Sequence, residues 1–343
     1  MFARSCVVNW FEALTGFPEA SYPQTQRRLR VVMGQLSSDA STRSYSVGSL
    51  ETPSLGELRA RTAHLAQAGG RTRVGVVQGD VRKLHADAEN AGALFQVASQ
   101  FNLLEMLHPD VSPEDGVARY ELDGTQGPAC AMAAGAATIF RNYLFRFPDG
   151  TIGQTRERQI DCLRDLGQAL GNDDDSLWRM KNGYALFTRA GLASVDRHLA
   201  GASDERIDQL RCLLRIGLHW GVGLTDIEPG PTVSQAFCSA LPVSYNRIVA
   251  EGLWIRFAKL VLEAAYEATL QAGWLSAART CSNRVFLTRL GGGAFGNQTQ
   301  WIDGALRRAL EQARGWGLDV RVVSYGPPDE GLQQLAREFG DAT

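Results

Sequence analysis

A glycine-rich stretch near the end of the chain is the part of the sequence best suited to hold an anion. Residues 287–301 read LTRLGGGAFGNQTQW and stand between a strand-like run and a helix-like run. A parallel strand that enters such a turn before a helix leaves backbone N–H groups unpaired at the positive end of the helix, which suits phosphate. Glycine also lets the backbone approach an anion closely. The stretch therefore predicts a phosphate or pyrophosphate site, and the alternative is a flexible connector.

The same glycines match the spacing of a dinucleotide-binding motif. Gly291, Gly293 and Gly296 satisfy GxGxxG. Two features oppose that interpretation: no second nucleotide-binding half follows in this chain, and the acid of the next strand, Asp319, stands at the start of that strand and not at its end. A P-loop is excluded because no Gly-Lys-Ser/Thr follows the glycines.

Composition limits the kind of partner. The 343 residues carry a net charge of −2 with both signs interspersed, so a nucleic-acid partner has little electrostatic support. No run of about 18 apolar residues is present, which predicts no membrane-spanning segment. The first twenty residues carry Glu12 and Glu19 and too short an apolar run for a signal peptide. We expect a cytoplasmic protein, or one exported without a cleavable signal peptide.

The cysteines and histidines do not form a metal-binding pattern. Six cysteines and five histidines are scattered along the chain, without a CxxC or an HExxH. That spacing favours free thiols over a disulfide framework. The sequence predicts neither a metal site nor a cofactor.

Strand-like and helix-like runs alternate along the chain. Strand candidates are residues 73–81, 92–101, 234–243, 284–290 and 319–326. Helix candidates are residues 127–145, 246–273 and 300–317. The polar region at about 150–210 includes a capped amphipathic helix after Ser203, and we interpret it as a helical insertion. Residues 1–65 form an N-terminal extension to a domain at 66–343. The alternation predicts an α/β fold with a parallel or mixed sheet between helical layers.

Four segments taken in order resemble a divergent branch of the macrodomain family: VVQGDV, FQVASQFNLLE, TQGPACAMAAG and FLTRLGGGAFGNQTQW. The likeness covers roughly residues 70–326, together with NWFEALTGF near the start. That branch includes bacterial effector enzymes that remove ADP-ribose from arginine, with ubiquitin as one substrate class. The usual Asn-Ala-Ala-Asn segment of macrodomains is replaced here by VASQFN. The resemblance implies a macrodomain-like mixed, mostly parallel sheet.

The resemblance also implies a set of ligand-binding residues. Asp80, beside Val81, matches the acid that accepts a hydrogen bond from adenine, whereas the residues alone also allow a local turn. Phe295 is placed to pack on the distal ribose, and Asn102 is expected near it. The residues expected around the phosphates are Thr125, Gln126, Gly127, Gly291, Gly292, Gly293, Ala294, Gly296 and Asn297.

Release of ADP-ribose from arginine is a glycoside-type hydrolysis, which needs a carboxylate near the anomeric carbon. Asp226 is the first choice, because it lies with Glu228 in a Gly/Pro-bounded loop after an apolar run. Glu105 follows the second strand candidate, and Asp123 stands two residues before Thr125, adjacent to a presumed phosphate loop. Each of the four has the alternative of a solvated or capping carboxylate.

The sequence leaves three functional classes open. The first is a hydrolase that removes ADP-ribose from arginine side chains of modified proteins, with ubiquitin as one such protein. The second is a non-catalytic module that binds ADP-ribose, which needs Asp80 and the loops but no carboxylate near the ribose. The third is an NAD-dependent oxidoreductase, which only the glycine spacing favours. ADP-ribose or an ADP-ribosylated protein is the expected partner.

Overall fold

A seven-stranded mixed sheet forms the centre of the computed structural model, which describes residues 8–65, 70–227, 230–246, 250–280 and 282–340. Five strands run parallel, and β9 and β4 extend this sheet at one edge in antiparallel pairings. In spatial order the strands are β4 (Ser49–Glu51), β9 (Gly217–Gly223), β10 (Thr232–Cys238), β6 (Leu94–Ala98), β11 (Arg284–Leu287), β12 (Asp319–Ser324) and β5 (Arg73–Gln78).

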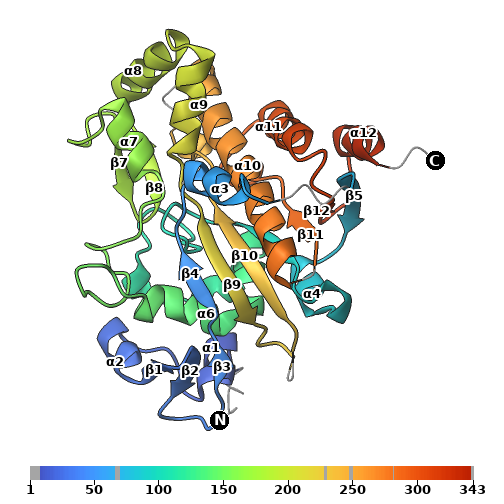
Figure 1. Cartoon of the computed structure of the whole chain (residues 1–343). Helices are drawn as coiled ribbons and strands as arrows, with labels where there is room; N and C mark the ends of the chain where they lie inside the picture. The colour runs from blue at the N-terminus through green and yellow to red at the C-terminus, as the bar shows by residue number, and fades with distance from the viewer. Residues whose placement is uncertain (1–7, 66–69, 228–229, 247–249, 281, 341–343) are drawn as a thin grey trace.

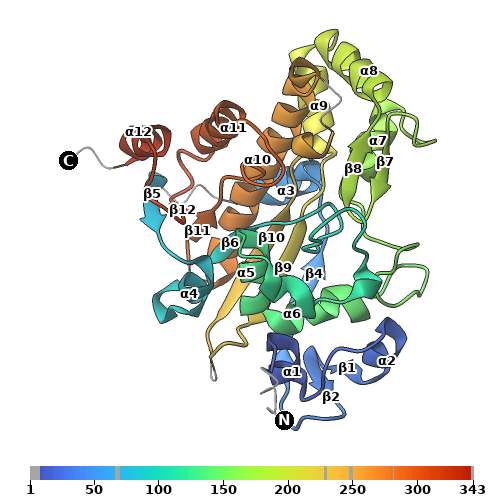
Figure 2. The same cartoon turned by 180° about the vertical axis from the view of Figure 1, so that it is seen from behind.

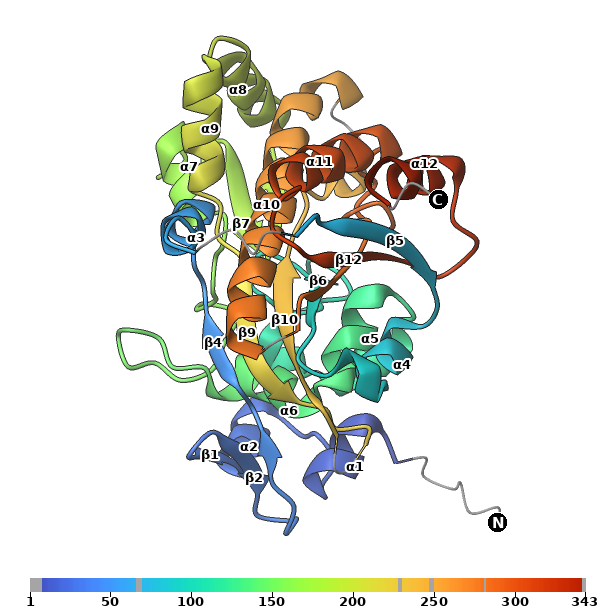
Figure 3. The ribbon, with the colours of Figure 1, turned by 45° about the vertical axis from the view of Figure 1, so that its right-hand side comes forward.

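Helices cover both faces of this sheet, as Figures 1 and 3 show. The first layer consists of α3 (Leu55–Thr62), α10 (Ile255–Thr280), α11 (Thr299–Gln312) and α12 (Glu330–Phe339). The second layer consists of α4 (Val81–Ala86), α5 (Gln126–Ala133) and α6 (Gly135–Ile139), seen in Figure 2. Helix α10 is apolar around most of its circumference and is buried almost throughout, as expected of a helix enclosed by other layers. The predicted mixed, mostly parallel sheet between helical layers is confirmed.

Two smaller units flank the sheet. The first contains α1 (Trp10–Thr15), α2 (Tyr22–Arg27), β1 (Leu29–Val32), β2 (Gln35–Ser38) and β3 (Tyr45–Ser46). The second contains α7 (Arg164–Leu170), β7 (Trp178–Lys181), β8 (Tyr184–Phe187), α8 (Arg189–Ala200) and α9 (Asp204–Cys212). The hairpin β7–β8 was not expected in a helical insertion. Its Asn182-Gly183 turn has positive φ at both residues, 48° and 81°, which is the type I′ geometry of tight hairpins.

Several element boundaries differ from the sequence-based ones. The strand expected at 73–81 ends at Gln78, because Asp80 caps a helix that begins at Val81. The helix expected at 127–145 is broken into α5, α6 and a π-helical turn, η4 (Phe140–Leu144). The helix expected at 246–273 is α10, and residues 247–249 lie outside the described residues.

Within the described residues, no helix is long and apolar enough to cross a membrane. Among the same residues, no three metal-ligating side chains of His, Cys, Asp or Glu gather into a group that could hold an ion.

Candidate functional site

A cavity of about 470 Å³ opens where the parallel strands end. Its walls come from the segments that follow β5, β6, β10, β11 and β12, together with the start of α5 and the hairpin β7–β8. Ligands of open α/β sheets bind at this edge, because the strand-to-helix turns there expose backbone groups. The predicted site residues that line the cavity are Asp80, Val81, Glu105, Asp123, Thr125, Gln126, Gly127, Gly291, Gly293, Ala294 and Phe295.

The glycine loop after β11 is a compact turn with free amide groups. The amide of Gly296 donates to the carbonyl of Gly293, and the amide of Asn297 donates to the carbonyl of Gly291, at 3.1 and 2.9 Å. Gly291 has φ 72° and its Cβ would collide with Ala240, so glycine is required there. Within the described residues, the amides between these two turns (293–295) donate to no acceptor. They are available to an anion in the cavity.

A second turn faces the cavity at the beginning of α5. The Thr125 amide donates to Asp123, 2.8 Å away, which orders the turn. The Gln126 side chain accepts a hydrogen bond from the amide of Ala98 at 2.9 Å and donates to the carbonyl of Gln96 at 2.8 Å. It therefore anchors the helix to β6 and is not free for a ligand. The amides of Gln126 and Gly127 have no acceptor in the described part of the chain.

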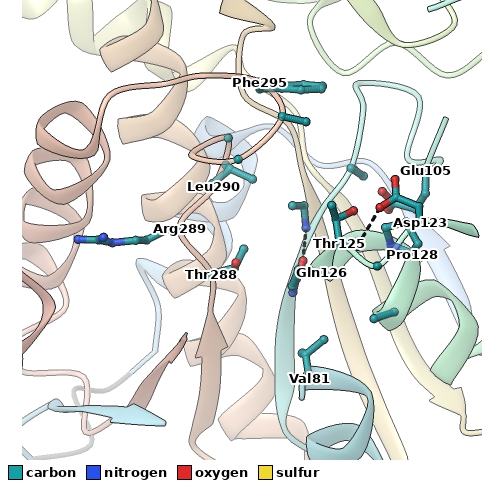
Figure 4. A pocket seen from close by; sticks show the side chains of 18 of the residues that line it. Val81, Glu105, Asp123, Thr125, Gln126, Pro128, Thr288, Arg289, Leu290 and Phe295 are labelled. Atoms are coloured by element: carbon teal, nitrogen blue, oxygen red, sulfur yellow. Dashed lines mark hydrogen bonds between the residues drawn. The ribbon is translucent and has the colours of Figure 1, made fainter. Parts of the chain in front are cut away.

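The acidic end of the cavity contains Glu105 and Asp123, which Figure 4 shows on the same side of it. Glu105 is 3% exposed, and its Oε1 is buried without a hydrogen-bond partner among the described residues. Burial raises the pKa of Glu105 well above its usual range; the positive charge of Arg141 opposes this shift and the negative charge of Asp123 adds to it. Glu105 therefore holds a proton under conditions in which an exposed glutamate is ionised.

The opposite end of the cavity is formed by the turns after β5 and β12. Asp80 caps α4, where one of its carboxyl oxygens accepts from the Arg82 amide at 2.9 Å. Tyr325 lines the cavity and is 87% exposed. An aromatic ring so exposed at a cavity rim is available for stacking on a planar ligand group.

Phe295 belongs to an aromatic cluster above the cavity. Its ring centre lies 5.3 Å from that of Tyr184 and 5.8 Å from that of Tyr245. The Tyr184 hydroxyl also donates to the carbonyl of Met106, 2.6 Å away, next to Glu105. Sequence reasoning missed Tyr184, Tyr245 and Tyr325. The Lys181-Asn182-Gly183-Tyr184 stretch carries a hairpin signal that would have brought Tyr184 into consideration.

Among the described residues that line the cavity, no lysine or arginine is free to meet a phosphate. Arg289 is the only lysine or arginine among the described residues that line it. Its guanidinium is bound to Asp303 at 2.9 Å and also to Asp329, and Figure 4 shows it pointing away from the cavity. An anion placed here would therefore meet backbone amides and not a charged side chain of the lining.

Asp226, the first-choice catalytic acid, does not reach the cavity. It pairs with Arg82 through both carboxyl oxygens, at 2.5 and 2.6 Å. Its loop follows β9, which runs antiparallel to β10. The end of β9 therefore lies at the edge where the parallel strands begin, opposite to the cavity. The ranking of Asp226 above Glu105 is corrected on this ground, and Glu228 lies outside the described residues.

Four other expected ligand residues do not line the cavity, although some of them shape it. Asn102 is completely buried, and its side chain contacts Gln159 and the amide of Leu104. Asn297 closes the glycine loop, with its side chain donating to the carbonyl of Leu241 at 2.9 Å. Gly292 and Gly296 lie within that loop without facing the cavity. Their location supports a role in forming the loop.

The first of the two smaller units, which contains α1 and α2, supports the acidic end of the cavity. The Glu19 carboxylate accepts hydrogen bonds from the amides of Val117 and Ala118 and from the Tyr143 hydroxyl, each at 2.8 Å. Trp10 donates to the carbonyl of Ala118 at 3.1 Å. The segment held in this way continues into a 3₁₀ helix, η3 (Ala118–Leu122), which ends beside Asp123.

Among solved structures, the chain is similar to poly(ADP-ribose) glycohydrolases. The enzyme from Thermomonospora curvata has 14% sequence identity and a TM-score of 0.45, with 84% of each chain covered. The same enzyme bound to the inhibitor ADP-HPD has 13% identity and a TM-score of 0.44, with 91% of this chain and 92% of that chain covered. The enzyme from Deinococcus radiodurans in complex with ADP-ribose has 13% identity and a TM-score of 0.44, with 84% and 92% covered. No protein-family model and no curated protein sequence matches the chain.

Proposed function

We propose that this chain is an ADP-ribosylhydrolase that cleaves the bond between ADP-ribose and an arginine side chain of a modified protein. The observation that carries the proposal is the buried, unpartnered carboxyl oxygen of Glu105 at one end of a cavity lined by two turns of free amides. Glycosidic hydrolysis uses a carboxylic acid beside the scissile bond, and the free amides of the two turns would bind the diphosphate of the same ligand.

The cavity suggests an orientation for the ligand. Adenine would lie between Asp80 and the exposed ring of Tyr325, since the free carboxyl oxygen of Asp80 can accept from an exocyclic amino group. The diphosphate would lie between the amides of the glycine loop and those at the start of α5. Each helix end stabilises an anion by about 0.3–1 kcal/mol. The distal ribose would then lie under Phe295 and beside Glu105.

The two carboxyl groups suit different steps of the reaction. Protonated Glu105 donates its proton to the guanidine nitrogen as the bond from that nitrogen to the anomeric carbon breaks. Asp123 accepts a proton from a water molecule as the oxygen of that water bonds to the anomeric carbon. The products are free ADP-ribose and a protonated arginine side chain. The negative charge of Asp123 also stabilises the guanidinium of the substrate.

The test compares wild type with Glu105→Gln on an arginine-ADP-ribosylated protein, with free ADP-ribose measured by mass spectrometry. The variant should lose about 10²–10⁴-fold in kcat, the usual contribution of a general acid, while binding ADP-ribose as wild type does. Glu121→Gln, the same change at an exposed position just before Asp123, should keep full activity.

Other results would select other functions. A wild-type chain that binds ADP-ribose but releases none from the modified protein is a binding module. Calorimetry that finds NAD bound more tightly than ADP-ribose favours the oxidoreductase. The identity of the protein substrate rests on the family resemblance alone, so the rate on arginine-modified ubiquitin should be compared with that on another arginine-modified protein.

A further inference from the structure

A completely buried arginine lies behind the loop that carries Glu105. Arg141 donates through Nε to the carbonyl of Leu103 at 3.1 Å and through Nη2 to the Thr138 hydroxyl at 2.9 Å. Its Nη1 lies 3.2 Å from Nδ1 of His219. The guanidinium carbon is 3.9 Å from the ring centre of Phe237. All the contacts that the structure gives this guanidinium are therefore with neutral groups.

A buried charge of this kind is expensive to keep without an ionic partner. Within the described residues, the hydrogen bonds and the ring contact of the Arg141 guanidinium include none with a carboxylate. It lies in the π-helical turn η4, a rare geometry that occurs frequently at functional sites. A buried charge and a rare backbone geometry therefore coincide at Arg141, which points to a role for this residue.

The residue that accepts from Arg141 Nε is itself strained. Leu103 has φ 64°, in the left-handed region that leucine seldom adopts. Its side chain packs so closely on Gly217 that a Cβ at that glycine would lie 2.5 Å from Leu103 Cδ1. The amide of Glu105, two residues further on, donates to the Tyr120 hydroxyl at 3.0 Å. The carbonyl of Leu103 and the amide of Glu105 are thus each held by a buried side chain. Strain at a functional site persists when surrounding contacts determine it in this way.

We propose that Arg141 is a positioning residue, which holds Leu103 in its left-handed conformation and thereby directs the Glu105 carboxyl into the cavity. The inference rests on the proposed function, since it assigns Arg141 a role in that reaction. Arg141 does not line the cavity, so its effect on the reaction is exerted through the loop that carries Glu105.

The charge of Arg141 also acts on the acid it positions. Arg141 lowers the pKa of Glu105 against the larger effect of burial. His219 stays neutral, because burial and the charge of Arg141 both lower its pKa, so its Nδ1 accepts from the guanidinium. The other titratable groups whose charges act on or respond to Glu105 are Asp123, Tyr120, Cys130 and Tyr184. Removal of the guanidinium should therefore move the Glu105 titration upward in pH.

The experiment uses Arg141→Met and Arg141→Lys in the full chain. ADP-ribose affinity should stay within about threefold of wild type in both. In Arg141→Met, kcat should fall by about 100-fold at a nearly constant KM, the loss expected when a catalytic group is misplaced by about 1 Å. Arg141→Lys should lose less activity, because lysine keeps the charge but lacks the planar fork that meets three acceptors.

A second measurement separates positioning from general structural support. The carboxyl carbon of Glu105 is followed by NMR in protein with ¹³C-labelled glutamate, and its signal is assigned by its loss in Glu105→Gln. The titration should move to higher pH in Arg141→Met and stay near wild type in Arg141→Lys. The alkaline limb of the pH profile of kcat should move together with the Glu105 titration, because activity requires Glu105 to be protonated.

Arg158→Met is the matched control. The Arg158 guanidinium lies 4.6 Å from the Phe147 ring centre and pairs with Asp149, away from the cavity. It should leave kcat and the Glu105 titration unchanged.

The proposal is overturned if Arg141→Met keeps wild-type kcat and titration, or if ADP-ribose affinity falls as far as kcat does. Should Arg141→Met fail to fold, unchanged kcat in Arg141→Lys overturns it equally. If wild type releases no ADP-ribose, the proposed function fails, while the NMR titration still reports whether Arg141 acts on Glu105.

Discussion

Replacement of Gly127 by alanine is the sharpest test of the geometry at the acidic end of the cavity. A Cβ on Gly127 would lie 2.8 Å from Cδ of Glu105, and closer still to a carboxyl oxygen of Glu105 and to the carbonyl of Ala98. Carbon atoms in contact lie about 3.5–4.0 Å apart, so the new methyl group and the Glu105 carboxyl must move apart by roughly 1 Å. Ala98 belongs to the central strand β6, so Glu105 and the start of α5 must move. Such an overpacked site costs about 1–3 kcal/mol of stability.

The expected kinetic result follows from the same displacement. Misplacement of a catalytic group by 1 Å lowers turnover by about 100-fold, so Gly127→Ala should release ADP-ribose about 100-fold more slowly than wild type. Gly124→Ala is the matched change in the same loop, where a Cβ meets nothing within 4 Å. Urea unfolding and the release assay are run on both variants. Equal rates and equal stability for the two alanine variants would refute the packing argument.

Three further predictions concern Tyr325, Asp226 and Glu105. Tyr325→Ala should weaken ADP-ribose binding by roughly tenfold in calorimetry, the typical loss of one base–aromatic stack, with kcat nearly unchanged. Asp226→Ala removes the ion pair with Arg82 and should cost about 0.2–1 kcal/mol in urea unfolding, while turnover stays within about threefold. Burial raises the pKa of Glu105, so the folded state keeps a proton that the unfolded chain releases. The stability that this bound proton provides is complete below the pKa of Glu105 in the unfolded chain. It is lost as the pH rises through the pKa of Glu105 in the folded protein. The free energy of unfolding in urea should therefore fall more between pH 5 and pH 8 for wild type than for Glu105→Gln.

The turns around the cavity could be predicted from the sequence because short-range chemistry determines them. Gly291 needs a left-handed backbone, Asp80 caps the helix that follows it, and Pro128 stands in the first turn of α5. Each of these preferences acts within a few residues. The alternation of apolar runs likewise predicted the strands of the parallel part of the sheet.

The order and direction of the strands could not be obtained in the same way. Asp226 follows an apolar run ending in a glycine-rich segment, which resembles the end of any buried strand, and nothing local indicates that β9 runs antiparallel. The environment of Glu105 depends on Arg141, which comes from a turn distant in sequence. The contribution of Tyr184 required recognition of the Asn-Gly hairpin inside a polar region. The direction of β9 and the contact with Arg141 depend on long-range packing, which is why sequence patterns did not reveal them. The Asn-Gly signal that leads to Tyr184 is local and is present in the sequence.

The hydrogen bonds of Glu19 affect the order in which the site can assemble. Glu19 and Val117 are 98 positions apart, so the turn before α5 cannot be secured until both segments have been synthesised and brought together. A protease that trimmed the chain after Glu19 would remove these hydrogen bonds together with the buried side chains of Phe11 and Phe17, and would release the segment leading to Asp123.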